Sequence, residues 1–372
     1  MNILIAPDSF KDALDAPGVC LAIERGILAA LPDSNIRCFP LADGGEGTAQ
    51  ILTFHNGGRQ IQCLVKDPLF RPVLASYGLS GNGETAFIEM AQASGLQLLK
   101  PEERNPLYTT TFGTGELIVD ALRHGVRNIV LGIGGSATND GGMGMAAALG
   151  CVFLDNAGNP LKPVGQNLGK VSRIIGNAAI EARVDVICDV DNPLFGPTGA
   201  ARVYAPQKGA DEAAVAELDT GLAHFAEILE IWSGQAVAEL PGAGAAGGLG
   251  AGAMVFLKAR MRPGIEAVMD YTGFETALEG IDLIVTGEGK IDHQTLHGKL
   301  ISGICRQAKV RNIPVIACCG ALEASASELL EIGLLAAFSI SNKPQSLADA
   351  ILRTAEGLEQ TAAQVFRIFG SK

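Results

Sequence analysis

The stretch GIGGSATNDGGMGMAAALG, residues 132–150, constrains the fold most, because it holds seven glycines directly after the apolar run 128–131. Each glycine in regular structure costs about 0.5–1 kcal/mol relative to alanine, so seven in one stretch require a physical reason. The usual reason is that another group must approach the backbone closely. A strand, a polar glycine loop and an alanine-rich helix in succession therefore predict a β–loop–α unit whose loop contacts a ligand.

Composition limits the class of ligand. The chain has 372 residues, 48% of them hydrophobic and 18% charged, which predicts a globular protein large enough for two domains. Its net charge is −12, it has no long basic stretch, and only 5% of its residues are aromatic, so we expect no nucleic acid partner. An acidic chain can still bind phosphates locally, through backbone N–H groups, a few Lys or Arg side chains and a metal ion.

Cysteine spacing and the N-terminus indicate where the protein acts. None of the eight cysteines forms a C-x-x-C pair and most lie in or beside apolar runs, so we predict reduced core thiols in a cytoplasmic protein. The first residues, MNILIAPDSF, lack a basic segment and a cleavage pattern, and they predict a strand rather than a signal peptide. No segment is apolar for about 18 residues, so we expect no membrane partner.

Two regions of alternating strands and helices flank a region of different pattern. Short apolar runs alternate with helical periodicity near both ends of the chain, whereas residues 62–89 alternate strands with turns. A buried first strand needs parallel neighbours, and the C-terminal apolar runs are the best candidates. We therefore predict two α/β domains: a discontinuous doubly wound domain of residues 1–62 and 265–372, and an inserted mixed α/β domain of residues 63–264.

The glycine loop after residue 131 fits phosphate binding better than the alternatives. It contains no lysine, which excludes the G-x-x-x-x-G-K-[ST] phosphate loop. Residues 132–137 fit a dinucleotide fingerprint with Asp155 at a suitable distance, but TNDGG separates them from the predicted helix, so this alternative is weaker. A tight packing turn is the structural alternative. The predicted phosphate contacts are Gly134, Gly135, Ser136, Thr138 and Asn139.

Polar residues also follow the first two predicted strands. Asp8, Ser9 and Lys11 come after the first strand, and Asp43 lies in the glycine loop after the second. In open α/β sheets, ligands bind beyond the carboxyl ends of the strands. A carboxylate, a hydroxyl and an ammonium this close together suit an anion with a metal ion or a transferable proton. Helix capping by Asp8 or Ser9, and a polar turn around Asp43, are the structural alternatives.

Two carboxylates follow another apolar strand, in CDVDNPL, residues 188–194. Asp189 and Asp191 point to the same side if the extended conformation continues, and two carboxylates suit Mg²⁺, which prefers oxygen ligands and keeps several waters. Asp189 is equally a candidate general base. An Asx-turn before Pro193 is the structural alternative.

A further polar glycine loop, TGEGKIDH, is predicted after the strand at residues 281–286. Glu288 lies between two glycines, and Lys290 with Lys299 gives the densest positive charge beside a predicted strand end. A charged surface turn is the alternative. Arg71 is a weaker candidate for an anion clamp, and a solvated surface position is its alternative.

Six motifs, taken in order along the chain, resemble those of one enzyme family. The motifs are ILIAPDSFKDAL, PLADGGEGT, GIGGSATNDGGMGMAAALG, CDVDNPLFGPTGAA, GAGAAGGLGAG and TGEGKIDHQTLHGK. Each motif is weak alone, but together they span nearly the whole chain and are similar to those of the glycerate kinase family, which includes bacterial enzymes of the glyoxylate and galactarate pathways. One small departure is Asp12, where relatives often have glycine.

The resemblance implies a kinase that transfers the γ-phosphoryl group of ATP to (R)-glycerate with Mg²⁺, giving 2-phosphoglycerate. It also implies one flavodoxin-like or Rossmann-like domain and one inserted domain of different topology. We expect the active site in the cleft between the two domains, where closure excludes water.

Within that function we assign expected roles to the candidate residues. Lys11 and Ser9 are predicted to hold phosphoryl or carboxylate oxygens. Asp8 and Asp189 are both candidates for the general base. Arg71 or Lys290 is predicted to clamp the glycerate carboxylate. Two other functions stay open: an NAD-linked hydroxy-acid oxidoreductase, based on the weak dinucleotide fingerprint, and a non-catalytic protein that binds glycerate or a nucleotide. No motif assigns the adenine subsite.

Overall fold

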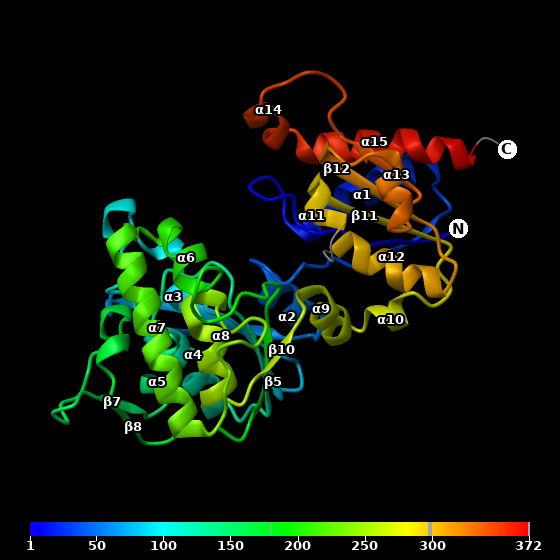
Figure 1. Ribbon diagram of the computed structural model, residues 1–372. Helices are drawn as coiled ribbons and strands as arrows, with labels where there is room; N and C mark the ends of the chain where they lie inside the picture. The colour runs from blue at the N-terminus through cyan, green and yellow to red at the C-terminus, as the bar shows by residue number, and fades with distance from the viewer. Residues whose placement is uncertain (179, 297–299, 371–372) are drawn as a thin grey trace. The chain divides into compact units, whose positions relative to one another are not determined.

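The structure is a computed structural model that describes residues 1–178, 180–296 and 300–370. The chain divides into two compact units (Figure 1). One unit combines Met1–Asp43 with Gly264–Lys372, and the other is Gly44–Pro263. Each unit has its own sheet and its own hydrophobic core. Across the described ranges, no helix is long and apolar enough to cross a membrane.

The first unit contains a five-stranded sheet in which every pairing is parallel. Its strands in spatial order are β13 (Ala336–Ser339), β12 (Val315–Leu322), β11 (Leu283–Ile291), β1 (Asn2–Ile5) and β2 (Asn35–Cys38). Numbered by their order within this unit, the strands run 2-1-3-4-5, which is the flavodoxin-like order of a doubly wound sheet. The predicted fold class is confirmed for this unit.

Helices pack against the sheet of the first unit. α1 (Ala16–Ala30) begins after Asp15, whose side chain accepts a hydrogen bond from the Gly18 N–H group. It packs with α15 (Thr354–Gly370) in the core cluster that also contains Ile3 and Val285, while α12 (Leu300–Val310) contacts β11 and β12. The shorter helices of this unit are α9 (Gly264–Thr272), α10 (Phe274–Ala277), α11 (His293–Leu296), α13 (Ala326–Glu331) and α14 (Leu347–Leu352).

The second unit contains a six-stranded mixed sheet. Its strands in spatial order are β10 (Arg260–Arg262), β9 (Arg183–Ile187), β6 (Asn128–Gly132), β5 (Thr85–Glu89), β4 (Pro72–Leu79) and β3 (Arg59–Lys66). The first four are parallel, and β4 and β3 are antiparallel, as the mixed α/β prediction requires. Glu89, Gly132 and Ile187 pair in register, so the carboxyl ends of β5, β6 and β9 lie level.

Helices and a small hairpin complete the second unit. β7 (Val152–Leu154) and β8 (Arg173–Ile175) pair with each other. The helices are α2 (Thr48–His55), α3 (Ala91–Ser94), α4 (Phe112–Arg123), α5 (Met143–Ala148), α6 (Ala200–Tyr204), α7 (Glu212–Ser233) and α8 (Ala245–Phe256). Short 3₁₀ turns occur at Leu96–Leu98, Pro101–Glu103, Gly165–Lys170 and Pro206–Lys208.

The structure differs from the sequence predictions at two places. Helix α2 belongs to the second unit, because it packs against β4 and β5. Glu288 and Lys290 lie within β11 and not in a loop, because the strand continues to pair with β12 beyond residue 286.

Candidate active site

The loop after β1 runs beside the end of β11 in the first unit. The Asp8 N–H group donates a hydrogen bond of 2.9 Å to the Gly287 carbonyl, and the Thr286 hydroxyl donates one of 2.8 Å to the Ala6 carbonyl. A β-carbon added to Gly289 would lie 3.7 Å from the Lys11 backbone nitrogen. The structure therefore places Asp8, Ser9 and Lys11 next to the segment that carries Glu288 and Lys290.

Asp8 is the perturbed carboxyl group of this edge. Burial and the nearby charge of Asp43 raise the pKa of Asp8 to about 7, although N–H groups of Ser9 and Asp43 partly oppose the shift. The Ser9 N–H group donates to Asp8 Oδ1 at 2.6 Å, and the Ser9 hydroxyl donates to the same oxygen at 3.3 Å. A carboxyl group that titrates near neutrality, with an oriented hydroxyl beside it, can accept a proton from an alcohol.

The charged groups on β11 already have partners. Lys290 Nζ lies 2.9 Å from a Glu323 oxygen and 3.4 Å from an Asp292 oxygen, and the hydrogen bond to Glu323 raises the pKa of Lys290. Glu288 accepts a hydrogen bond from the Thr295 hydroxyl. The role of Lys290 as a clamp for the glycerate carboxylate stays a prediction. In the structure, the carboxylates of Glu323 and Asp292 balance the positive charge of Lys290. Lys299 lies outside the described residues.

The glycine loop of the second unit has an exposed edge and a buried centre. Gly134 and Gly135 are exposed and Ser136 is half-buried, whereas Thr138 and Asn139 are fully buried. Gly135 has a φ of +70°, a left-handed conformation that favours glycine. The exposed edge carries the bare main chain that the sequence predicted.

Asp140 fixes the buried centre of this loop, a role that the sequence analysis missed. Its carboxylate accepts hydrogen bonds from the N–H groups of Thr111 at 2.7 Å and of Gly142 and Gly144 at 3.1 Å, and from the Thr111 hydroxyl at 2.9 Å. Burial raises the pKa of Asp140 while these donors lower it. The loop conformation therefore depends on one buried acidic side chain.

Lys208 is the second residue that the sequence analysis missed. Its Nζ lies 2.7 Å from Ser136 Oγ and 2.7 Å from the Thr138 carbonyl oxygen. The side chain is fully buried, and desolvation lowers its pKa to about 7 against the opposing charge of Asp140. Nothing in the local sequence distinguishes this lysine from a surface lysine. A buried amine thus lies directly beneath the exposed edge of the glycine loop.

Polar atoms beside this amine have no protein partner. Among the residues that the structure describes, Thr138 Oγ1 and both amide atoms of Asn139 are buried without a hydrogen bond. Buried polar atoms without a partner are rare. Each lowers the free energy of unfolding by about 1–3 kcal/mol unless a ligand or a water molecule forms a hydrogen bond with it. Gly247, at φ +70°, packs over them so closely that a β-carbon there would lie 2.1 Å from the Thr138 carbonyl oxygen. The predicted phosphate contacts at Thr138 and Asn139 stay predictions, because both residues are fully buried in this structure.

The dinucleotide alternative does not fit this loop. The helix that follows, α5, begins at Met143 and not at the third position of the fingerprint. Asp155 is half-buried in a turn of its own, where its Oδ1 accepts hydrogen bonds from the N–H groups of Ala157 at 2.9 Å and Asn159 at 2.8 Å. These hydrogen bonds lower the pKa of Asp155, and the ones that Asn159 donates have the largest effect.

Asp189 and Asp191 are exposed just beyond the end of β9. Asn192 anchors the segment, since it accepts a hydrogen bond of 2.6 Å from the Tyr204 hydroxyl and donates one of 2.8 Å to the Thr198 carbonyl. Within the described ranges, no group of three or more His, Cys, Asp or Glu residues is arranged to hold a metal ion. The pair of carboxylates still fits Mg²⁺, which takes one or two carboxylates with waters and substrate phosphates.

Arg71 lies in the turn between β3 and β4, at the edge of the sheet where β5 ends. Its Nε lies 2.6 Å from an Asp67 oxygen and its Nη1 lies 2.7 Å from a Glu103 oxygen. The hydrogen bonds to Glu103 and Asp67 raise the pKa of Arg71. As with Lys290, its predicted role as a clamp stays a prediction, and two acidic partners hold the guanidinium group in place.

Glu89 is a third residue at this edge that the sequence analysis missed. Its side chain accepts a hydrogen bond of 2.9 Å from the Ala49 N–H group in the first turn of α2. Burial raises the pKa of Glu89, and the nearby charge of Glu46 adds to the shift. The glycine loop before α2 is therefore tied to the end of β5.

Known proteins resemble this chain over nearly its whole length. The sequence profile of the glycerate kinase family matches residues 3–370. A protein named glycerate kinase from Halalkalibacterium halodurans is 47% identical over 98% of this chain and 97% of its own length. A protein named glycerate 2-kinase from Escherichia coli K12 is 44% identical over 94% of this chain and 93% of its own.

A solved structure agrees with these sequence matches. It is a crystal structure from Salmonella typhimurium LT2, of a protein assigned as glycerate kinase 2. Its TM-score to this chain is 0.90 at 44% identity, and the match covers 99% of this chain and 98% of that one. The chain therefore belongs to the glycerate kinase family and is a kinase, an enzyme that transfers phosphoryl groups.

Proposed function

We propose that this enzyme transfers the γ-phosphoryl group of ATP to (R)-glycerate, with Mg²⁺, and releases ADP and 2-phosphoglycerate. One observation carries the proposal: the polar motifs follow, or lie at, the carboxyl ends of parallel strands in both sheets. They occur after β1, β2, β6 and β9 and at the end of β11. That edge is where open α/β sheets bind ligands. The name of the Escherichia coli relative supports the 2-position as the phosphorylated hydroxyl.

The first unit supplies the groups for proton transfer and charge stabilisation. Asp8, with its pKa near 7, is the better placed of the candidate bases, because it is half-buried beside Ser9 and Asp43. Lys11 is exposed in the same loop and makes no ion pair within the described ranges. Phosphoryl transfer needs positioning and charge stabilisation above all, so Lys11 is assigned to the transferring phosphoryl oxygens.

The second unit supplies main-chain donors for anionic oxygens. Gly134, Gly135 and Ser136 form the exposed edge of a loop that Lys208 supports from beneath. Asp189 and Asp191 would hold a magnesium ion, which when bound neutralises phosphate charge. A cytoplasmic location and small-molecule partners alone stay predictions from the sequence.

Substitution at Asp8 tests the assignment. We expect Asp8→Asn to lower kcat for glycerate phosphorylation by at least about a hundredfold, since general base catalysis contributes ~10²–10⁴-fold. Asp33→Asn is the matched control, because it removes one exposed carboxylate from the same unit. Steady-state release of ADP measures both variants. If Asp8→Asn keeps the wild-type kcat while folded, Asp8 is not the base.

A further inference from the structure

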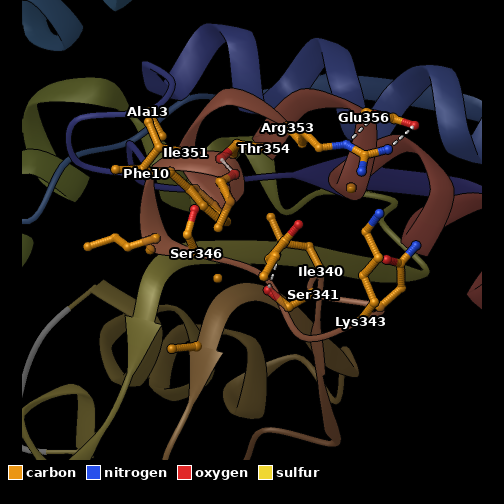
Figure 2. A pocket seen from close by; sticks show the side chains of 18 of the residues that line it. Phe10, Ala13, Ile340, Ser341, Lys343, Ser346, Ile351, Arg353, Thr354 and Glu356 are labelled. Carbon is orange, nitrogen blue, oxygen red and sulfur yellow. Dashed lines mark hydrogen bonds and ion pairs between the residues drawn. The ribbon is translucent and has the colours of Figure 1, made fainter.

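The first unit contains a cavity of about 580 Å³ at the carboxyl ends of its strands. The loop after β1 lines it through Phe10 and Lys11, and Gly289 and Gly320 line it from β11 and β12. The segment after β13, with α14 and the start of α15, forms the rest of its lining. Figure 2 shows this cavity. Its volume falls within the range of ~300–1,000 Å³ that small-molecule sites occupy.

The lining combines apolar walls with charged side chains, among which the cations Lys11, Lys343 and Arg353 outnumber the carboxylates Asp12 and Glu356. Phe10 and Ile340 are buried side chains of the core cluster, and Ile351 from α14 adds a third apolar side chain (Figure 2). Lys11 and Lys343 also line the cavity, and neither makes an ion pair within the ranges that the structure describes. Such a lining suits a flat apolar group that carries a negatively charged end.

Bare main chain lies on one side of the cavity. A β-carbon on Gly320 would lie 2.5 Å from the Gly289 carbonyl oxygen, so the two strand ends approach too closely for a side chain at residue 320. A β-carbon on Gly289 would contact the backbone of the β1 loop. Because Gly289 and Gly320 both line the cavity and carry no side chains, a ligand there would meet their main chain, next to the loop that carries Lys11.

Strand order marks the same position. In a sheet of order 2-1-3-4-5, the connection after β1 leads toward one edge of the sheet, and the connection after its neighbour β11 leads toward the other edge. The position between these two strands is the switch point, and the ligand crevice lies there, outside the carboxyl ends of the strands. The β1 loop and Gly289 of β11 both line the cavity. The cavity thus lies at the place where such folds bind nucleotides and related cofactors.

We propose that this cavity binds the base and ribose of the adenine nucleotide, with the phosphates directed toward Lys11. The proposal rests on the proposed function for the identity of the nucleotide as phosphoryl donor. Glycerate is a poor occupant, because a three-carbon hydroxy acid has no apolar surface to match Phe10, Ile340 and Ile351. A nucleotide bound here extends from the apolar walls to the loop that carries Asp8.

A pair of variants on α14 tests the proposal. Ala350 lines the cavity, whereas Leu352, two residues on, does not and is 83% exposed. We expect Ala350→Phe to fill the cavity, raising the KM for ATP and the Kd for Mg·ADP by at least about tenfold with an unchanged KM for glycerate. Leu352→Phe places the same aromatic ring outside the cavity and should behave as the wild type. Thermal unfolding of both variants controls for misfolding.

Photolabelling of the wild-type enzyme provides a second, variant-free measurement. We expect 8-azido-ATP to label a peptide within residues 340–353, and excess ATP to prevent the labelling. Wild-type turnover together with labelling elsewhere, or an unchanged KM for ATP in folded Ala350→Phe, would overturn the cavity assignment and leave the function standing. Weakened Mg·ADP binding in Ala350→Phe without any wild-type turnover would support the cavity and overturn the function.

Discussion

Lys208 Nζ donates hydrogen bonds to Ser136 Oγ and to the Thr138 carbonyl oxygen, each at 2.7 Å, from a fully buried position. These two contacts join a 3₁₀ turn, Pro206–Lys208, to a loop about seventy residues earlier in the sequence. The exposed glycines of that loop are proposed to bind anionic oxygens. Lys208 is therefore a positioning residue, which acts through the loop that it supports.

Removal of this support should impair catalysis. We expect Lys208→Met to lower kcat/KM by about tenfold to a hundredfold, because small displacements of positioning groups cost that much. Lys170→Met is the control, because Lys170 is an exposed lysine of the same unit that donates one hydrogen bond, to Asn167. Steady-state kinetics with separate KM values for ATP and glycerate would show which ligand the loop contacts. Equal kcat/KM values for both variants and the wild type would exclude the positioning role.

The same lysine should make stability depend on pH. Its pKa falls from 10.5 to about 7 on folding, so the stability that the neutral amine contributes is fully present above pH 10.5 and is lost as the pH falls through 7. Between pH 7 and 10 the wild type should gain about 3–4 kcal/mol in free energy of unfolding relative to Lys208→Met. Denaturant unfolding measures this difference, and a value that does not vary with pH would contradict the assigned burial.

Asp8 should show the opposite trend. Its pKa rises from 3.8 to about 7 on folding, so the stability contributed by the protonated carboxyl is present below pH 3.8 and is lost as the pH rises through 7. Between pH 4 and 8 the wild type should lose up to about 4 kcal/mol relative to Asp8→Asn. The same comparison with Asp33→Asn should show no such trend. Unfolding curves at several pH values decide the matter.

Asp140 should stabilise the fold mainly through the hydrogen bonds that its carboxylate accepts. In Asp140→Asn an amide group replaces one acceptor oxygen, so at least one of the three N–H donors that it binds loses its acceptor. We expect a loss of about 2–4 kcal/mol in free energy of unfolding, because buried unsatisfied donors cost ~1–3 kcal/mol each. Asp155→Asn, in an exposed turn, should cost under about 1 kcal/mol. Similar losses in the two variants would contradict the buried network.

The sheets and their loops were predictable because local pattern determines them. The apolar run 128–131 lies within β6, and the strand predicted at the N-terminus is β1. The rule that ligands bind at the carboxyl ends of strands then brought Asp8 and Asp43 together, as the pKa of Asp8 now indicates. Family resemblance supplied the activity, which no pattern of residues alone could specify.

The missed features depend on contacts between distant segments. Lys208 is buried only because its turn packs beneath the loop of Ser136, and its own neighbours in sequence give no sign of this. The charge on Lys290 is balanced by Glu323, which lies on the segment after β12. Helix α2 joins the second unit because Glu89 binds its first turn. Tertiary contacts override local pattern in each case.

The position of the transferred phosphate tests the central claim most directly. The wild-type enzyme would be incubated with Mg·ATP and (R)-glycerate, and ³¹P–¹H correlation NMR would show which carbon bears the phosphate. We predict ADP and 2-phosphoglycerate, with the phosphorus coupled to the C2 proton. A folded enzyme that releases no ADP, or that couples the phosphorus to the C3 protons, would contradict the proposed function.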